Sequence, residues 1–119
     1  MYESGENYLE TILMLKETKS LVRSVDIANE LNFSKPSVSR AMGILKEDGY
    51  ITVGRKGAIE LTDIGRKKAE GIYERHKLLT AFLQKTAGVT EEAAEEDACR
   101  MEHIISNEVF QGIKRFMEV

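Results

Sequence analysis

Residues 24–61, which read SVDIANELNFSKPSVSRAMGILKEDGYITVGRKGAIEL, decide the fold. Their first half holds two short apolar stripes at helical spacing: Ile27, Ala28 and Leu31, then Val38, Ala41, Met42 and Leu45. Asn32-Phe33 predicts a tight break between the two helices. Ser34 is a good N-cap for the second helix, which Gly49 can terminate. Two short helices joined by a tight turn are typical of a helix-turn-helix.

The second half of this stretch predicts a β-hairpin. A β-branched run at residues 51–53 and an apolar run at residues 58–61 flank the turn Gly54-Arg55-Lys56-Gly57. Short apolar strands around a turn bounded by glycines form a hairpin, with Arg55 and Lys56 at its tip. Helix-turn-helix followed by hairpin is the order of elements in a winged helix-turn-helix.

The rest of the chain reads as helices. We expect a first helix from Glu6 to about Thr18 and a long helix from Thr62 to about Lys85, with Gly88 after it. Thr90 and Ser106 are candidate N-caps of two further helices, the first running through Ile105. The sequence therefore predicts a mainly α protein: a winged helix-turn-helix DNA-binding domain with a two-stranded wing at 1–70, and a helical domain at 71–119.

Charge is unevenly distributed along the 119 residues, although the net charge is only −3. Between Lys35 and Lys77 there are ten basic and six acidic residues, whereas between Thr86 and Val119 there are eight acidic and three basic ones. A basic middle and an acidic end suit two different tasks, namely contact with phosphates and binding of a cation.

The predicted second helix of the helix-turn-helix presents a polar face near its N-terminus. With its apolar stripe buried, the candidate contacts to double-stranded DNA are Ser34, Lys35, Pro36, Ser37, Ser39 and Arg40, together with Arg55 and Lys56 on the wing. The alternative is an ordinary three-helix core whose exposed face is polar. Because the overall charge is negative, a monomer would bind DNA weakly, and a homodimer on two half-sites is expected.

A second group of residues has metal-ligating chemistry. Cys99, Glu102 and His103 stand at i, i+3 and i+4, so they share one face of a helix. A thiolate, a carboxylate and an imidazole can together ligate a divalent transition metal. Further ligands can come from other helices: His76, Glu10 and Asn7. Each also has an ordinary interpretation: Cys99 as a small buried apolar residue, His76 as a surface histidine, and Glu10 as a solvated charge.

Three segments together resemble the diphtheria toxin repressor and manganese transport regulator family. They are Asp97-Ala98-Cys99-Arg100-Met101-Glu102-His103, Arg75-His76 and Glu6-Asn7-Tyr8-Leu9-Glu10-Thr11-Ile12. The resemblance covers nearly the whole chain. It implies a dimeric, metal-activated repressor of metal-uptake genes, in a short form without the C-terminal barrel domain of many members. It also implies that residues 71–119 are the helical metal-binding and dimerisation domain.

The resemblance implies a mixed ligand set. Cys99, Glu102 and His103 match the primary site of the iron-responsive branch, whereas Glu10 matches the manganese branch. The manganese branch has an acid where Asn7 stands, and the iron-responsive branch has a methionine there. The ancillary site of the iron-responsive branch falls on Thr80 and Glu95, of which Thr80 is a poor ligand. Because a thiolate favours softer ions than Mn(II), we expect Fe(II) over Mn(II), with Zn(II), Co(II) or Ni(II) able to bind in vitro.

Other functional classes are less well supported. The N-terminus does not resemble a signal peptide and no apolar run approaches a membrane span, so we expect a cytoplasmic protein that uses neither a membrane nor a small-molecule substrate. The alternatives are a metal-independent winged-helix regulator and a small metalloenzyme, although the chain lacks an HExxH motif. An apolar stripe in the last helix, at Val109, Ile113, Phe116 and Met117, fits either internal packing or a dimer interface.

Overall fold

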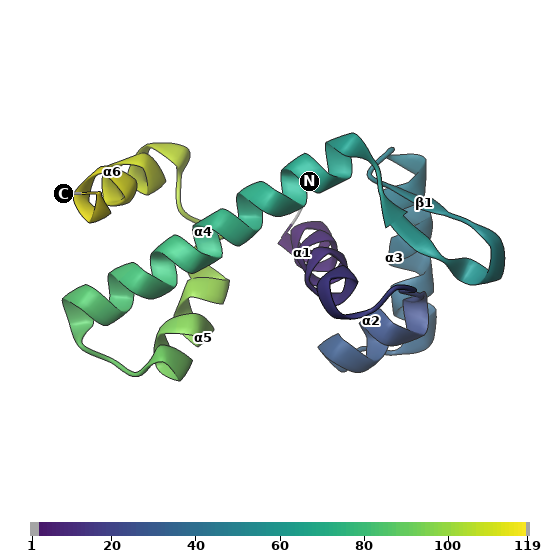
Figure 1. Cartoon of the computed structure of the whole chain (residues 1–119), viewed down its shortest axis with the longest axis horizontal. Helices are drawn as coiled ribbons and strands as arrows, with labels where there is room; N and C mark the ends of the chain where they lie inside the picture. Colours follow the sequence, from purple (N-terminus) through teal and green to yellow (C-terminus); the bar gives the residue numbers. More distant parts are fainter. Residues whose placement is uncertain (1–2, 119) are drawn as a thin grey trace. The chain divides into compact units, whose positions relative to one another are not determined.

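The computed structural model describes residues 3–118, and most of them are helical (Figure 1). In chain order the elements are α1 (Glu3–Thr18), α2 (Ser24–Leu31), α3 (Lys35–Glu47), β1 (Ile51–Val53), a short 3-10 turn η1 (Arg55–Gly57), β2 (Ile59–Leu61), α4 (Asp63–Ala87), α5 (Glu91–Met101) and α6 (Asn107–Met117). The chain forms two compact units, divided between Glu70 and Gly71 within the long helix α4. The predicted fold class is confirmed: a winged helix-turn-helix followed by a helical part.

The helix-turn-helix consists of α2 and α3, joined by a turn at Asn32. Asn32 adopts a left-handed conformation with φ of 60°, which asparagine tolerates better than most residues, and this reverses the chain after α2. Ser34 is the N-cap of α3, since its hydroxyl oxygen accepts a hydrogen bond from the Ser37 N–H. At the start of α2 the N-cap is Arg23, and the carboxylate of Asp26 accepts the Arg23 N–H at 2.9 Å.

The wing is the antiparallel hairpin of β1 and β2. Its register pairs Ile51 with Leu61, Thr52 with Glu60 and Val53 with Ile59. The connecting turn has two residues with positive φ, Lys56 at 60° and Gly57 at 75°. Both strands turn an isoleucine inward, because Ile51 and Ile59 are each 1% exposed. The hairpin is therefore anchored in the core while its basic tip stays in solvent.

The core of the N-terminal unit joins all of its elements. Its least exposed side chains come from α1, the following loop, α2, α3 and the two strands: Leu9, Ile12, Val22, Ile27, Val38, Ile51 and Ile59. Val22 also accepts a backbone hydrogen bond from the Ile59 N–H at 2.8 Å, and Lys16 pairs with Glu60 at 2.7 Å. Helix α1 is therefore fixed to the wing as well as to α2.

Helix α4 begins in close contact with the end of the helix-turn-helix. Thr62 caps α4, because its hydroxyl accepts the Gly65 N–H at 3.1 Å and donates to the Gly49 carbonyl oxygen at 2.7 Å. A Cβ atom at Gly65 would lie 1.9 Å from the Tyr50 carbonyl oxygen. Only glycine permits this approach, which sets where α4 leaves the wing.

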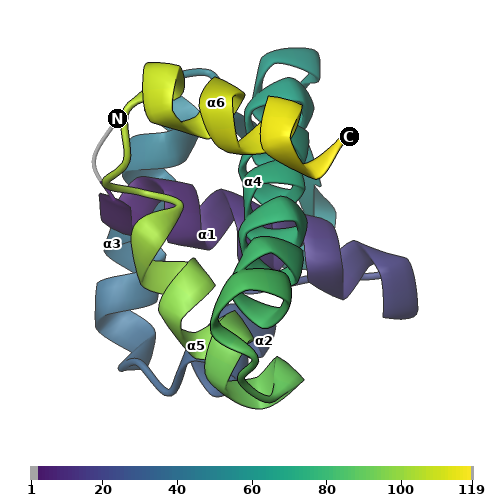
Figure 2. The same cartoon turned by 90° about the vertical axis from the view of Figure 1, so that its left-hand side faces the viewer.

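The C-terminal unit consists of the rest of α4 with α5 and α6 packed against it (Figure 2). Thr90 and Ser106 cap α5 and α6 through their hydroxyl groups, as predicted. Helix α5 ends at Met101, whereas the sequence predicted helix through Ile105; residues 102–105 form a turn in which the Ile105 N–H still bonds to the Met101 carbonyl oxygen. Among the described residues, no helix combines the length and the apolar character needed to cross a membrane.

The apolar stripe of α6 is divided between the interior of the unit and its surface. Phe110 is buried, and Phe116 packs edge-on against Phe82 of α4 with ring centroids 6.0 Å apart. Val109 and Phe116 nevertheless remain 51% and 52% exposed within one chain. Helix α6 thus contributes to the core and also leaves apolar surface uncovered.

Candidate metal centre and DNA-contacting surface

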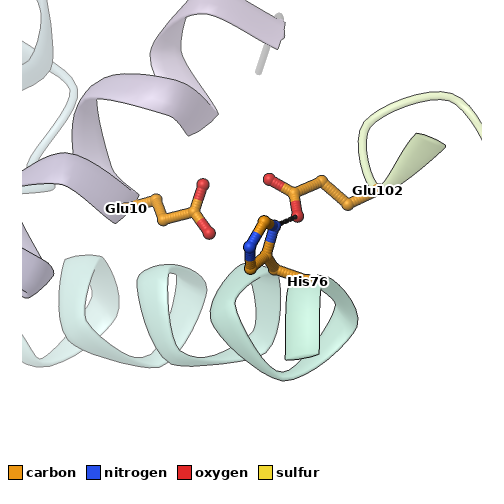
Figure 3. Close-up of side chains that lie close together, drawn as sticks. All are labelled: Glu10, His76 and Glu102. Carbon is orange, nitrogen blue, oxygen red and sulfur yellow. Dashed lines mark hydrogen bonds and ion pairs between the residues drawn. The ribbon is translucent and has the colours of Figure 1, made fainter. Parts of the chain in front are cut away.

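The C-terminal unit brings two of the predicted metal ligands together. His76 lies in α4 and Glu102 directly after α5, and Nδ1 of His76 lies 2.9 Å from Oε2 of Glu102 (Figure 3). The Glu102 side chain is fully buried, and that of His76 is 21% exposed. A carboxylate from the turn after α5 and an imidazole from α4 therefore meet in the interior of this unit.

The second oxygen of Glu102 is left without a hydrogen bond. Oε1 is buried and, within the described part of the chain, accepts none. Nε2 of His103 lies 3.2 Å away but is not aligned to donate to it. Burying a carboxylate costs roughly several kcal/mol of folding free energy unless nearby charges and hydrogen bonds compensate this cost. An unsatisfied carboxylate oxygen beside two imidazoles fits a divalent transition metal, which would supply the missing partner.

Cys99 has a different environment from the other predicted ligands of its helix. It is exposed and lies in the last turn of α5. His76 and Glu102 belong to a group of candidate ligand atoms that all lie within 4.8 Å of one another. Among the described residues, this group includes neither Cys99 nor His103. The role of Cys99 as a ligand remains a prediction.

Arg75 is a residue of this region that sequence reasoning did not single out as functional. Its Nη1 donates to two backbone carbonyl oxygens, those of Glu102 and Ile105, both at 3.2 Å. Its guanidinium lies over the ring of Phe110, 5.0 Å from the centroid. These contacts join α4, the turn after α5 and α6. Contacts to backbone carbonyls leave no pattern of residue types in the sequence, so sequence reasoning could not find them.

The two remaining predicted ligands belong to the N-terminal unit. Asn7 and Glu10 lie on α1 at i and i+3, which places them on the same face of that helix. Asn7 is half-buried and Glu10 is buried. Glu10 is also drawn in Figure 3.

The positions of the ancillary site implied by the family resemblance are poorly suited to a metal. The Thr80 hydroxyl donates to the carbonyl oxygen of His76 at 2.8 Å, so it already serves the backbone of its own helix. Glu95 is exposed on α5. An ancillary site built from these two residues stays an open prediction.

The predicted DNA-contacting residues of the helix-turn-helix are all exposed. Val38 and Met42 turn the apolar side of α3 inward, and the opposite side presents Lys35, Pro36, Ser37, Ser39 and Arg40. The hydroxyl of Ser34 is engaged in capping and also donates to the Ser37 hydroxyl at 2.8 Å. Ala41, predicted as part of the buried stripe, is only half-buried.

The wing adds two positive charges to the same unit. Arg55 and Lys56 are exposed at the tip of the hairpin, in the turn between β1 and β2. A protein uses such side chains to contact phosphates or the minor groove, while the first turns of a recognition helix reach base edges. The N-terminal unit thus has both parts of a winged-helix surface for DNA.

Comparison with known families also finds two parts, with the boundary between residues 59 and 62. Residues 1–59 match the N-terminal DNA-binding domain of iron-dependent repressors, and residues 62–119 match their metal-binding and dimerisation domain. A helix-turn-helix transcriptional regulator of Methanocaldococcus jannaschii is 34% identical over 119 residues, which cover 99% of this chain and 95% of the relative.

Better characterised relatives are longer. The diphtheria toxin repressor of Corynebacterium diphtheriae is 30% identical over 118 residues, which cover 99% of this chain and 52% of the repressor. The iron-dependent repressor IdeR of Mycobacterium tuberculosis is 32% identical over 109 residues, which cover 92% of this chain and 47% of IdeR. The chain therefore spans about half the length of these repressors.

Solved structures agree with this assignment of the fold. A manganese-dependent transcriptional repressor in complex with manganese is 27% identical with a TM-score of 0.89, and the match covers 96% of this chain and 52% of that one. The manganese regulator SloR is 25% identical with a TM-score of 0.85, and the match covers 96% of this chain and 53% of SloR.

Proposed function

Because this chain belongs to the iron-dependent repressor family, we propose that it is a metal-dependent repressor that binds double-stranded DNA as a homodimer. Its regulated genes are those of iron or manganese homeostasis. The observation that carries the proposal is the buried Glu102, whose Oε1 accepts no hydrogen bond from the described residues and lies among imidazoles. Members of the family are transcriptional repressors, which favours this function over a metalloenzyme.

The ligand set that we propose has a centre and two outer parts. His76, Glu102 and His103 form the centre, and their contacts at 2.9 Å and 3.2 Å support this choice. Asn7 and Glu10 complete the set from the DNA-binding unit, and Cys99 contributes its thiolate. When bound, the metal supplies the positive charge that the buried carboxylate requires.

Regulation follows from the distribution of these ligands over both units. Glu10 and Asn7 lie on α1, which packs against α2 of the helix-turn-helix. His76, Glu102 and His103 belong to the unit that would form the dimer. If ligands from both units bound one ion, they would fix the spacing of the two α3 helices in a dimer. Binding then shifts the population toward the DNA-competent state, to the extent that this state holds the ion more tightly.

For the physiological ion we propose Fe(II) in preference to Mn(II). The preference depends on Cys99, because a thiolate selects ions softer than Mn(II). Carboxylates and imidazoles without a thiolate also accept Mn(II). Similar proteins are named for both ions, and one solved relative, ScaR, has been described with bound Zn²⁺. Replacing Cys99→Ala should reduce the preference for Fe(II) over Mn(II) and leave a response to Mn(II). A variant that keeps the wild-type response to Fe(II) would show that the thiolate is not a ligand.

For the DNA surface we propose that α3 reads bases and that the wing contacts the backbone. Lys35, Ser37, Ser39 and Arg40 face solvent on the first turns of α3, and Arg55 and Lys56 extend from the hairpin. Ser34 and Pro36 shape the start of the helix. Replacing Arg40→Ala should reduce discrimination between sequences, whereas Lys56→Ala should weaken binding to all sequences about equally.

The test of the proposed function is fluorescence anisotropy of labelled operator-like DNA with the purified protein at fixed salt. Fe(II) and Mn(II) are titrated anaerobically, and a chelator provides the metal-free reference. We expect at least about a tenfold rise in affinity with one of the ions, which corresponds to roughly 1.4 kcal/mol of coupling. Equal affinity with metal and with chelator would contradict the proposal and favour a metal-independent winged-helix regulator.

A further inference from the structure

The turn after α5 carries two of the proposed ligands, Glu102 and His103, and its backbone is held from outside. Regular helix ends at Met101, so carbonyl groups in this region lack the partners that a continuing helix would give them. Nη1 of Arg75 donates to the carbonyl oxygens of Glu102 and Ile105, both at 3.2 Å. One guanidinium thus spans the turn from its first residue to its last.

The hold on Glu102 comes from two neighbouring residues of α4. Arg75 binds its backbone carbonyl, and His76 lies 2.9 Å from its carboxylate. Because both ends of Glu102 are fixed to consecutive residues of one helix, the carboxylate has little freedom to turn away from His76. The guanidinium contacts carbonyl oxygens, so it fixes the residue without neutralising the carboxylate that a cation needs.

Arg75 itself is fixed by α6. Its guanidinium lies over the ring of Phe110, with a distance of 5.0 Å to the centroid, and Phe110 is 5% exposed. Cation–π stacking on a buried ring holds the planar group in one orientation. The donors that face the turn are therefore set by the packing of α6 against α4.

We propose that Arg75 is a positioning residue for the metal centre: it clamps the turn at residues 102–105 so that Glu102 and His103 stay aligned with His76. This inference rests on the proposed function, because it assumes that these residues bind a metal. Residues that orient metal ligands typically change metal affinity about 10- to 100-fold when they are replaced. Arg75 should therefore affect metal binding without contacting the ion.

The test uses Co(II) as the probe, since both its affinity and its visible absorption spectrum report on the ligands. Arg75→Met keeps an apolar chain of similar length and removes every donor, and we expect about tenfold weaker Co(II) binding with an altered spectrum. The matched control is Lys114→Met, because Lys114 also joins α6 to α4, through Glu74 at 2.9 Å, but does not touch the turn. The control should keep the wild-type spectrum and an affinity within about twofold.

Arg75→Lys separates charge from geometry. Its single ammonium group on a shorter chain cannot reproduce the fixed pair of donors, so we expect affinity between those of the wild type and of Arg75→Met. If Arg75→Met does not fold, as judged by circular dichroism, Arg75→Lys decides: wild-type affinity and spectrum in that variant would overturn the inference.

The outcomes separate the inference from the proposed function. A folded Arg75→Met protein that binds Co(II) with wild-type affinity and spectrum overturns the positioning role and leaves the repressor function intact. A wild-type protein that binds neither Co(II) nor Mn(II) contradicts the proposed function itself, and the inference with it. Weaker binding and a changed spectrum only in the Arg75 variants support both.

Discussion

The carboxylate of Glu102 is fully buried, and one of its two oxygens accepts no hydrogen bond from the described residues. Without a metal this group therefore lowers stability, because its charge is only partly compensated. Glu102→Gln keeps the shape and removes the charge. In the presence of a chelator we expect the free energy of unfolding of the variant to be about 1–3 kcal/mol higher than that of the wild type.

With metal bound, the wild type should become more stable than Glu102→Gln. A ligand that binds only the folded state at about 100 times its Kd stabilises the wild type by roughly 2.7 kcal/mol, and the variant should gain little of this. Urea unfolding with chelator and with Mn(II) measures both differences. The control is Glu92→Gln, an exposed position on α5, which should respond to metal as the wild type does. A Glu102→Gln protein that is less stable than the wild type in chelator contradicts the interpretation of the unsatisfied oxygen.

Asp26 gives a pH dependence at the scale of one residue. The hydrogen bond from the Arg23 N–H, with smaller contributions from Lys19, lowers the pKa of Asp26 below its usual range. A lowered pKa in the folded state means that the stabilisation is complete above the unfolded pKa of about 3.9 and is lost as the pH falls through the folded pKa. The stability difference between wild type and Asp26→Asn should therefore shrink below about pH 4. Carboxyl NMR titration should give Asp26 a pKa below about 3.9, and a value at or above it would contradict this account.

At the scale of elements, the helix starts were largely predictable from sequence because capping is local. Ser34, Thr62, Thr90 and Ser106 each cap the helix that follows, through hydrogen bonds to a residue three positions on. The start of α2 differs: Ser24 has the right side chain for an N-cap, but the carboxylate of Asp26 takes the Arg23 N–H, and Arg23 becomes the cap. The end of α5 was not predictable, because donors from the distant Arg75 hold the turn that ends it.

The junction of the wing with α4 yields a prediction about Gly65. A Cβ atom there would lie 1.9 Å from the Tyr50 carbonyl oxygen, and a backbone atom cannot move aside as a flexible side chain can. Gly65→Ala should lower the free energy of unfolding by about 3 kcal/mol. Gly71→Ala is the control in the same helix, where a Cβ atom meets nothing within 4 Å. This control should raise stability by about 0.5–1 kcal/mol, since alanine favours helix over glycine. Equal effects of the two substitutions in urea unfolding would show that the close approach is not rigid.

At the scale of the whole molecule, the exposed apolar face of α6 fits the proposed dimer. Val109 is 51% exposed, so a glutamate there is solvated in a monomer but becomes a buried charge in an apolar interface. Val109→Glu also places an acid three residues after the Ser106 N-cap, which completes a capping box and preserves the helix. We expect the dimer dissociation constant, measured by analytical ultracentrifugation, to rise at least about tenfold. Ile64→Glu, an exposed apolar position in the other unit, is the control. An unchanged dimer dissociation constant in Val109→Glu would show that the interface does not include this face of α6.

The candidate site shows what sequence reasoning can and cannot supply. The donor types at His76, Glu102 and His103 were recognisable from chemistry, spacing and resemblance, and the structure places these side chains next to one another. Cys99 is exposed in the last turn of α5, and its role as a ligand remains a prediction from spacing and resemblance. The clamp by Arg75 was invisible because it joins residues 27 and 30 positions apart through backbone atoms.

The central claim is that a metal held by Glu102 controls DNA binding, and one measurement tests it most directly. Anisotropy of labelled operator-like DNA is recorded for Glu102→Gln and for the control Glu92→Gln, each with saturating metal and with chelator. The account predicts that the control keeps at least about a tenfold metal-dependent rise in DNA affinity and that Glu102→Gln loses it, with its affinity fixed at the metal-free value. A Glu102→Gln protein that responds to metal as the control does would contradict the claim.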